Sequence, residues 1–89
     1  MKAVITVIGT DRKGIIAGVS GILCEADVNI DDLSQTILQG IFTMVMLVDL
    51  AGMNRPLEAL QTALEACGAR LGVEIRFQRA EVFTAMHQV

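Results

Sequence analysis

The sequence contains no tryptophan and no tyrosine, and its three aromatic residues are all phenylalanine. It is also poor in cations, with seven lysines and arginines against ten aspartates and glutamates, for a formal net charge of −3. Nucleic-acid phosphates require clustered cations, and unpaired bases stack on aromatic side chains. The composition therefore argues against nucleic acid as a partner.

Long hydrophobic runs are absent too. Although 53% of the residues are hydrophobic, no uninterrupted apolar run approaches the about 20 residues that span a bilayer. The first residues, Met1-Lys2-Ala3, lead directly into a β-type pattern and lack the small-residue cleavage site of a secretory signal. We therefore expect a cytoplasmic protein with no membrane partner.

Cysteine and histidine are too few and too dispersed to indicate a metal site or a catalytic centre. Cys24 and Cys67 lie far apart in helical patterns, without CxxC or Cys/His spacing, so we expect buried, reduced thiols and no metal or other cofactor. The single histidine, His87, lies near the end of the chain, and the sequence places no serine, cysteine or carboxylate pair to act with it. We expect a surface histidine and no enzymatic activity.

The hydrophobic period divides the first half of the chain into a strand, a helix and a hairpin. Residues 3–8 are β-branched and apolar on both faces, as in a central strand. From Ile15 the apolar residues recur at helical spacing, which predicts a helix over residues 12–27. Residues 29–39 and 41–50 predict two strands that turn at Gln39-Gly40, and the second is again apolar on both faces.

The second half predicts one more helix and one more strand. Asn54-Arg55-Pro56 supplies a cap residue and a proline for the first turn, and Gly72 is a candidate C-cap. From Val73 onward apolar and polar residues alternate, which is typical of an edge strand with one wet face. The order βαββαβ predicts an α+β, ferredoxin-like fold: a four-stranded antiparallel sheet with two helices on one face.

No internal repeat, low-complexity segment or long linker divides the chain. We therefore assign residues 1–79 to one domain and residues 80–89 to a C-terminal tail. Within this tail Val82, Phe83 and Met86 recur at one-turn spacing, which predicts a short amphipathic helical turn.

The segment from Gly9 to Gly14 lies where proteins often bind anions, between a strand and a helix N-terminus. Its GxxxxG spacing lacks the Lys-Ser/Thr that a nucleotide-binding P-loop requires, because Ile15-Ile16 follows. A nucleotide site is therefore excluded. We expect Asp11 to cap the helix by accepting hydrogen bonds from the N–H groups of Lys13 and Gly14, a role that does not exclude ligand contact.

Glycines within the first helix require an explanation, because each costs about 1 kcal/mol relative to alanine. Gly14, Gly18 and Gly21 form a stripe with Glu25 beside the apolar face. Two interpretations stay open. The stripe allows close packing on the second helix, or it allows a small ligand to approach the backbone.

Taken together, these features resemble an ACT domain, the small-molecule-sensing module of amino-acid metabolism. The resemblance rests on the strand followed by G-x-D-R-x-G, the apolar helix, Asn29-Ile30 opening the second strand, the hairpin, and the second helix and strand. The short chain and the ending "VFTAMHQV" are most similar to small, free-standing ACT proteins of unassigned function. ACT modules of the glycine-cleavage regulator and of formyltetrahydrofolate deformylase are also similar.

The resemblance implies a ligand site between two domains. In amino-acid-binding ACT domains, the ligand contacts the loop after strand one and the start of strand two of the neighbour. In this chain the corresponding residues are Asp11, Gly14 and Ile15 in the loop, and Asn29 and Ile30 in the strand. N–H groups at a helix N-terminus suit an α-carboxylate, and Asp11 and Asn29 suit an α-ammonium.

We also expect a homodimer or a larger homo-oligomer. Helices cover one sheet face only, yet both predicted central strands are apolar on both sides. Edge strands could pair side by side, as the resemblance implies, or the open faces could pack back to back; the tail could instead cover its own sheet. Two functions stay open: a regulatory module that binds a metabolite such as an amino acid, and a protein-interaction or assembly module with no ligand.

Overall fold

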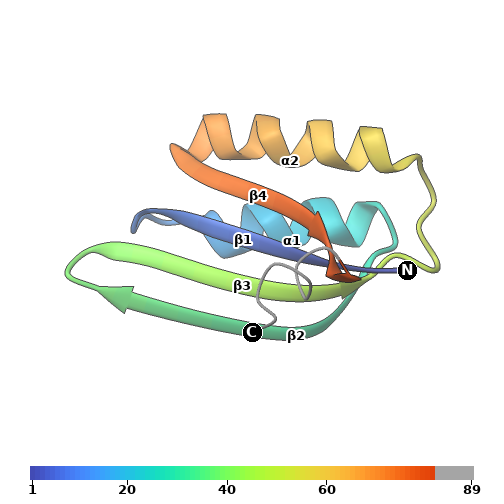
Figure 1. The fold of residues 1–89 in the computed structure, drawn as a ribbon. Helices are drawn as coiled ribbons and strands as arrows, with labels where there is room; N and C mark the ends of the chain where they lie inside the picture. Colours follow the sequence, from blue (N-terminus) through green and yellow to red (C-terminus); the bar gives the residue numbers. More distant parts are fainter. Residues whose placement is uncertain (82–89) are drawn as a thin grey trace.

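The computed structural model describes residues 1–81 of the chain. Six elements follow one another in the order βαββαβ (Figure 1). They are β1 (Lys2–Thr10), α1 (Ile15–Glu25), β2 (Asn29–Leu38), β3 (Ile41–Asp49), α2 (Leu57–Leu71) and β4 (Val73–Arg79).

The strands form one antiparallel sheet in the order β2-β3-β1-β4. The sequence therefore predicts the fold class correctly: an α+β, ferredoxin-like domain with two helices. Strands β1 and β3, which are apolar on both faces, are the central pair, and β4 lies at an edge as its alternating pattern indicates. A β-bulge interrupts the β2–β3 pairing between Ile30 and Asp32, which the sequence pattern does not reveal.

The hydrophobic core lies between one face of the sheet and the two helices. Strand β1 contributes Ala3, Ile5 and Val7, all fully buried. The residues of α1, β3 and α2 that complete most of this core are Ile15, Val19, Leu23, Phe42, Met44, Met46, Val48, Leu60, Leu64 and Cys67. Alternate residues of β1 and β3 therefore supply the sheet side of the core.

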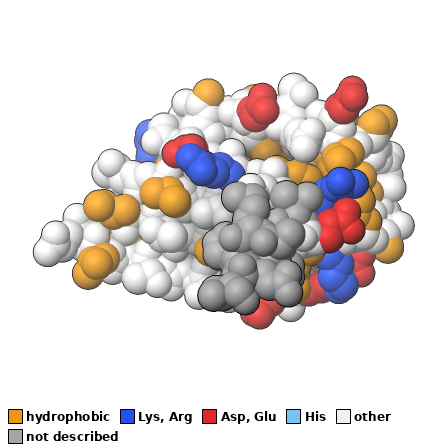
Figure 2. All heavy atoms as spheres, in the orientation of Figure 1, with side chains coloured by type: hydrophobic (Ala, Val, Ile, Leu, Met, Phe, Trp, Pro, Cys, Tyr) orange, Lys and Arg blue, Asp and Glu red, His pale blue; other side chains and the backbone are white. Residues whose placement is uncertain are grey.

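The opposite face of the sheet keeps large apolar side chains at its surface. Ile8 of β1 is 42% exposed, and Ile41 of β3 is 55% exposed. Val45 on β3 is also exposed. Figure 2 shows hydrophobic side chains gathered on this face near the turn of the β2–β3 hairpin. Within the described residues, this face therefore keeps exposed apolar side chains near the hairpin turn, as the sequence predicts, although Val4 on the same face is buried.

The predicted N-cap of α1 is wrong. The helix begins at Ile15 rather than at residue 12, its N-cap is Gly14 in the left-handed conformation (φ 89°), and no side chain donates or accepts a capping hydrogen bond. The carboxylate of Asp11 is therefore not the cap, because Gly14 turns the chain away from the helix axis one residue before α1 starts.

The predicted cap of α2 is wrong as well, because Pro56 occupies the N-cap position and Asn54 lies before it. The Asn54 side chain donates instead to the backbone oxygen of Glu25 and to the Asp27 carboxylate, both at 2.9 Å. Arg55 donates to the same Glu25 oxygen at 2.8 Å. This pair of side chains satisfies a carbonyl at the C-terminal end of α1. The predicted C-cap Gly72 is confirmed, with φ 71°.

The glycine stripe of α1 has two parts. A Cβ at Gly18 would lie 3.1 Å from the Leu71 side chain and 3.3 Å from the Cys67 sulfur, so this glycine allows α1 to pack closely on α2. A Cβ at Gly21 or Gly14 would meet no atom within 4 Å. The packing interpretation therefore holds for Gly18 alone.

The prediction of two buried, reduced cysteines is confirmed only in part. Both cysteines are free, but only Cys67 is buried; Cys24 is exposed, because it lies beside the apolar stripe of α1 rather than on it. No helix within residues 1–81 is long and apolar enough to cross a membrane. The amphipathic turn expected at Val82, Phe83 and Met86, and His87, lie outside the described residues.

Gly68 on α2 and Gly21 on α1 provide a matched test of how closely α2 packs on β4. A Cβ at Gly68 of α2 would lie 2.8 Å from the backbone oxygen of Val73, so we expect Gly68→Ala to lower the free energy of unfolding by about 1–3 kcal/mol. Gly21→Ala adds a methyl group in open space and is expected to raise it by about 0.5–1 kcal/mol. Urea denaturation of both variants measures the difference, and equal effects would contradict the packing described here.

Candidate functional site

The loop between β1 and α1 continues the sheet before it turns into the helix. The Asp11 N–H donates to the backbone oxygen of Gly40 at 2.8 Å, so the loop is held beside the tip of the β2–β3 hairpin. Asp11 and Gly14 are both exposed, whereas Ile15 is 2% exposed and belongs to the core. Ile15 can therefore offer a ligand its backbone N–H but not its side chain.

The N-terminus of α1 is electrostatically uncompensated. Its first turn holds no acidic residue, and no side chain caps it. The first N–H groups of a helix have no partner within the helix, and the helix dipole adds partial positive charge at that end. Because Gly14 has no side chain and the space around it is open, an anionic group can approach these N–H groups.

At the start of β2, Asn29 belongs to a hydrogen-bonded charged group. Its side-chain nitrogen donates to the Asp31 carboxylate at 2.7 Å. Asp31 also forms an ion pair with Lys2, and the Lys2 nitrogen lies 3.8 Å from the carboxylate of Asp49. These contacts fix the orientation of the Asn29 amide and leave its oxygen as an acceptor. Ile30 is partly buried and packs against the core.

This group shifts two ionisation equilibria. The hydrogen bond from Lys2, with a second from Asn29, lowers the pKa of Asp31 from its usual value near 3.8. The same hydrogen bond raises the pKa of Lys2 from its usual value near 10.5. Both side chains therefore remain charged across the neutral range.

The two halves of the predicted site lie at opposite ends of the sheet. Asn29 is paired with Asp49, which is itself paired with Lys2 at the start of β1, whereas Asp11 follows the last residue of β1 (Figure 1). The nine residues of β1 between them correspond to about 30 Å at about 3.3 Å per residue. A single chain therefore does not bring the loop residues and Asn29 to one ligand.

Sequence reasoning missed the contacts of Arg12 and of Lys2. Arg12 donates to the backbone oxygen of Leu71 at 3.1 Å, so it connects the loop to the C-terminal end of α2. A cation there also suits the helix dipole. The partner is 59 residues away in the sequence, and Lys2 and Asp31 are likewise distant, so no local pattern could have indicated these contacts.

The described part of the chain holds no group of three or more histidine, cysteine, aspartate or glutamate side chains that could bind a metal ion. The chemistry available at the loop and at Asn29 is hydrogen bonding and charge, which is suited to binding a small zwitterion.

Comparison with known proteins identifies the family. The family model described as "ACT domain" matches residues 2–78, and the chain belongs to this family. A UPF0237 protein from Clostridium acetobutylicum is 51% identical over 89 residues, covering the full length of both chains. A solved ACT domain protein from Streptococcus pneumoniae is 46% identical with a TM-score of 0.79, covering 93% of each chain.

Two larger proteins contain a similar fold. A protein solved as a putative glycine cleavage system transcriptional repressor is 28% identical with a TM-score of 0.75, over 89% of this chain and 45% of that one. A formyltetrahydrofolate deformylase from Burkholderia mallei has a TM-score of 0.80 at 18% identity, over 88% of this chain and 28% of its own, and that likeness concerns the fold alone. These findings confirm the resemblance predicted from the sequence.

The contacts around Asp31 predict how stability depends on pH. Because the folded-state pKa of Asp31 is lowered, its carboxylate stabilises the fold above its usual pKa near 3.8, and this contribution is lost as the pH falls through the folded-state value. We expect Asp31→Asn to reduce the loss of unfolding free energy below about pH 4. Urea denaturation at a series of pH values measures the free energy of unfolding of the wild type and of the variant.

The control is Asp11→Asn, because no side-chain hydrogen bond to the Asp11 carboxylate is found within residues 1–81. High salt should reduce the effect at Asp31, since Lys2 is half exposed. If Asp31→Asn and Asp11→Asn lose the same unfolding free energy as the pH falls below about 4, this explanation is contradicted.

Proposed function

We propose that this chain is a small, non-enzymatic regulatory protein of the cytoplasm that pairs with a second copy and binds an α-amino acid between the two. The observation that carries the proposal is the separation of the predicted site residues. Asp11 and Gly14 lie at one end of the sheet and Asn29 at the other, so a complete site requires the loop of one copy and the β2 start of its partner.

The exposed edge of β2 suits this pairing. Along the whole strand no side chain is fully buried, and Ile37 and Leu38 are 53% and 69% exposed. In an antiparallel pair of β2 strands related by a twofold axis, the start of one strand lies beside the end of the other. Asn29 of one copy then lies near Leu38 of the other, and the hydrogen bond from Asp11 to Gly40 holds the loop at that same end.

The two half-sites offer complementary chemistry for a zwitterion. The uncapped N-terminus of α1 beside Gly14 suits an α-carboxylate. The Asp11 carboxylate and the oxygen of the Asn29 amide, both acceptors, suit an α-ammonium group. Ile15 contributes its N–H, and the partly buried Ile30 contributes apolar surface. The described half-sites specify the main-chain groups of an amino acid rather than its side chain.

Similarity to regulators supports the regulatory role. The glycine cleavage repressor is 28% identical to this chain, and a solved regulatory subunit of aspartate kinase from Thermus thermophilus is 26% identical with a TM-score of 0.67. Both contain this fold within a protein named as a repressor or as a regulatory subunit. A small free-standing domain with the same fold is suited to a similar role.

Mixing two inactive variants tests whether the site is shared. A bulky side chain at Gly14 blocks the helix N-terminus, and Asn29→Ala removes the amide, so we expect Gly14→Leu and Asn29→Ala each to lose the amino-acid-dependent rise in melting temperature. Mixed dimers of the two variants contain one intact site, because the undamaged loop and the undamaged Asn29 then meet. Equilibrated mixtures should recover about a quarter of the wild-type binding capacity.

The screen itself compares dye-reported melts with each of the twenty amino acids, followed by calorimetry on the variants. Gly21→Leu is the control for added bulk, since Gly21 also has open surroundings but lies within α1 rather than in the loop. If no amino acid raises the melting temperature of the wild type or of the mixture, the ligand-binding proposal is refuted. If either single variant alone binds the amino acid, the shared site is refuted.

A charge on β2 tests the pairing mode. We expect Ile37→Glu to shift the protein from dimer to monomer at micromolar concentration, because in this pairing each new carboxylate would lie beside the apolar Ile30 of the other copy. Ile8→Glu, on the open sheet face, should leave the dimer intact. Sedimentation equilibrium distinguishes the outcomes. Dissociation by Ile8→Glu but not by Ile37→Glu would indicate packing of the open faces instead.

One observation favours the alternative of an assembly module without ligand. The Asn29 amide nitrogen is already hydrogen-bonded to Asp31, which in turn pairs with Lys2, so Asn29 has a structural role of its own. If the screen finds no ligand while Ile37→Glu still dissociates the dimer, this alternative replaces the ligand-binding proposal.

A further inference from the structure

The helix-facing side of β2 keeps apolar side chains in contact with water. Leu33 and Ile37 lie on this side, because each is directly opposite a buried core residue of β3, Met46 and Phe42 respectively. Leu33 is nevertheless 39% exposed and Ile37 is 53% exposed. The two helices therefore bury the core side of β3 but stop short of this edge strand.

Helix α1 adds an isoleucine to the same surface. Gly18 faces α2, because a Cβ there would contact side chains of that helix, and α2 packs over β4 at the other edge of the sheet. Ile16 precedes Gly18 by two residues, about 200° around the helix, so it lies on the opposite side of α1, toward β2. Ile16 is 40% exposed. We call Ile16, Leu33 and Ile37 the α1–β2 patch.

The patch begins at the end of the sheet where the ligand-binding loop lies. The hydrogen bond from Asp11 to Gly40 holds the loop beside the tip of the β2–β3 hairpin. Ile16 is in the first turn of α1, directly after this loop, and Ile37 is near the end of β2, directly before the hairpin turn. Both isoleucines are therefore close to the N–H groups proposed to hold the ligand carboxylate.

The two segments that form the patch contain no charged residue. Residues 15–24 are IIAGVSGILC and residues 33–38 are LSQTIL. The guanidinium of Arg12 donates to the Leu71 oxygen at the C-terminal end of α2, which is the side of α1 away from the patch. An ionised group buried against the patch would find no counter-ion within these segments, and burial of an unpaired charge is costly.

The proposed pairing of two copies adds a further apolar side chain. When Asn29 of one copy lies beside Leu38 of the other, Ile30 lies beside Ile37 of that other copy. Ile30 is on the helix-facing side as well, because it is directly opposite the buried Val48. Apolar side chains of both copies then meet beside the N-terminus of α1.

We infer that the amino acid bound between the two copies has an aliphatic side chain, which lies against Ile16 and Ile37 of one copy and Ile30 of the other. The inference rests on the proposed function and deepens it. The loop and Asn29 address the main-chain groups of the ligand, whereas the α1–β2 patch selects its side chain. An aliphatic side chain covers apolar surface that a single domain leaves in water.

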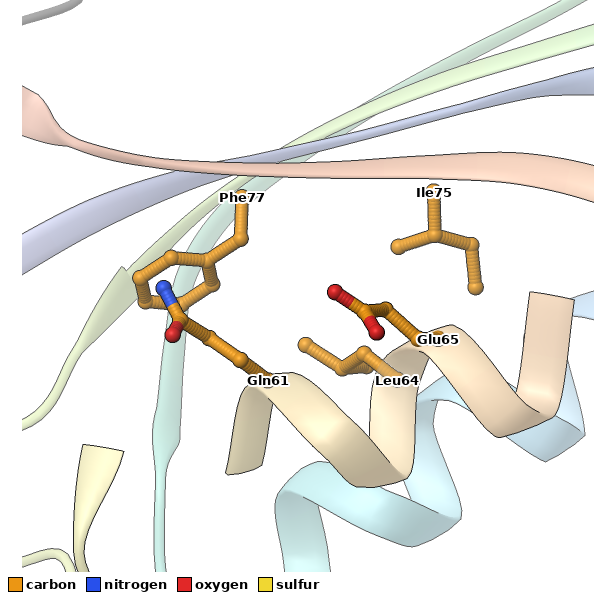
Figure 3. A pocket seen from close by; sticks show the side chains of 5 residues that line it. All are labelled: Gln61, Leu64, Glu65, Ile75 and Phe77. Atoms are coloured by element: carbon orange, nitrogen blue, oxygen red, sulfur yellow. The ribbon is translucent and has the colours of Figure 1, made fainter. Parts of the chain in front are cut away.

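The other side of the helix layer offers a different environment. A small pocket lies between α2 and β4, where the side chains of Gln61 and Glu65 point from the helix toward Ile75 and Phe77 (Figure 3). The exposed lining of this pocket is mainly polar, and Arg79 lies on the same face of β4. Strands β4 and β2 are opposite edges of the sheet. A ligand at the β2 edge therefore meets the apolar patch and not this pocket.

The test is calorimetric titration of the wild-type protein with glycine, alanine, valine, leucine, asparagine and aspartate. Each buried methylene group strengthens binding by about fourfold, so affinity should rise along the first four, and leucine should bind more tightly than alanine by about tenfold or more. Asparagine and aspartate have nearly the shape of leucine but lose hydration against the isoleucines, so both should bind about tenfold more weakly than leucine.

Two isoleucines of similar exposure provide matched variants. Ile16→Ala should weaken leucine binding by about tenfold and change alanine binding by less than about twofold, because only the longer side chain reaches the patch. Ile8→Ala, at a site on the open sheet face that is 42% exposed, should change neither. Melting temperatures without ligand establish that both variants are folded.

The outcomes separate this inference from the proposed function. If glycine, asparagine or aspartate binds as tightly as leucine, the inference is overturned and the amino-acid site stands. The inference is also overturned if Ile16→Ala weakens alanine and leucine equally, or if Ile8→Ala has the same effect as Ile16→Ala. If the wild type binds none of the twenty amino acids, the proposed ligand and this inference are both refuted.

Discussion

The hydrophobic contact between one face of the sheet and the two helices determines what the rest of the domain exposes. Fully buried Ile5, Met44 and Met46 point toward α1 and α2, where Leu23 and Leu64 meet them. The two helices among the described residues both fill this one interface, and neither covers the other sheet face. The exposed apolar side chains on the other sheet face and the exposed edge of β2 are therefore consequences of the same two-layer packing.

Most of the fold was predictable because it depends on hydrophobic period. Residues 3–8 and 41–50 are apolar on both faces, a pattern typical of the central strands of a sheet. The helix starts were not predictable, because capping depends on backbone direction as well as residue type. Asp11 has a suitable carboxylate, but Gly14 at φ 89° sets the start of α1. The Asn54 side chain donates a hydrogen bond to the distant Glu25 carbonyl instead of capping its own helix.

The candidate site was only partly predictable for a different reason. Local sequence marked the loop through its glycines and charges, and the family resemblance added Asn29. The partners that orient these residues are far apart in the chain: Lys2 contacts Asp31, and Arg12 contacts Leu71. Contacts over such separations arise from the antiparallel register and the helix crossing, which a single sequence does not encode in any local pattern. The register also shows that the two half-sites lie at opposite ends of one domain.

The loop after β1 contacts the segment that leads into β4. A Cβ at Gly9 would lie 2.6 Å from the Val73 side chain, so β1 and β4 are in close contact just before the loop. Arg12 binds the last carbonyl of α2, one residue before Gly72 turns the chain into β4. A ligand that changed the position of Arg12 would therefore act on the same turn that sets where β4 begins. Because a ligand shifts an equilibrium only through contacts that differ between two states, the Arg12–Leu71 hydrogen bond is the contact whose loss or retention would connect the loop to the start of β4.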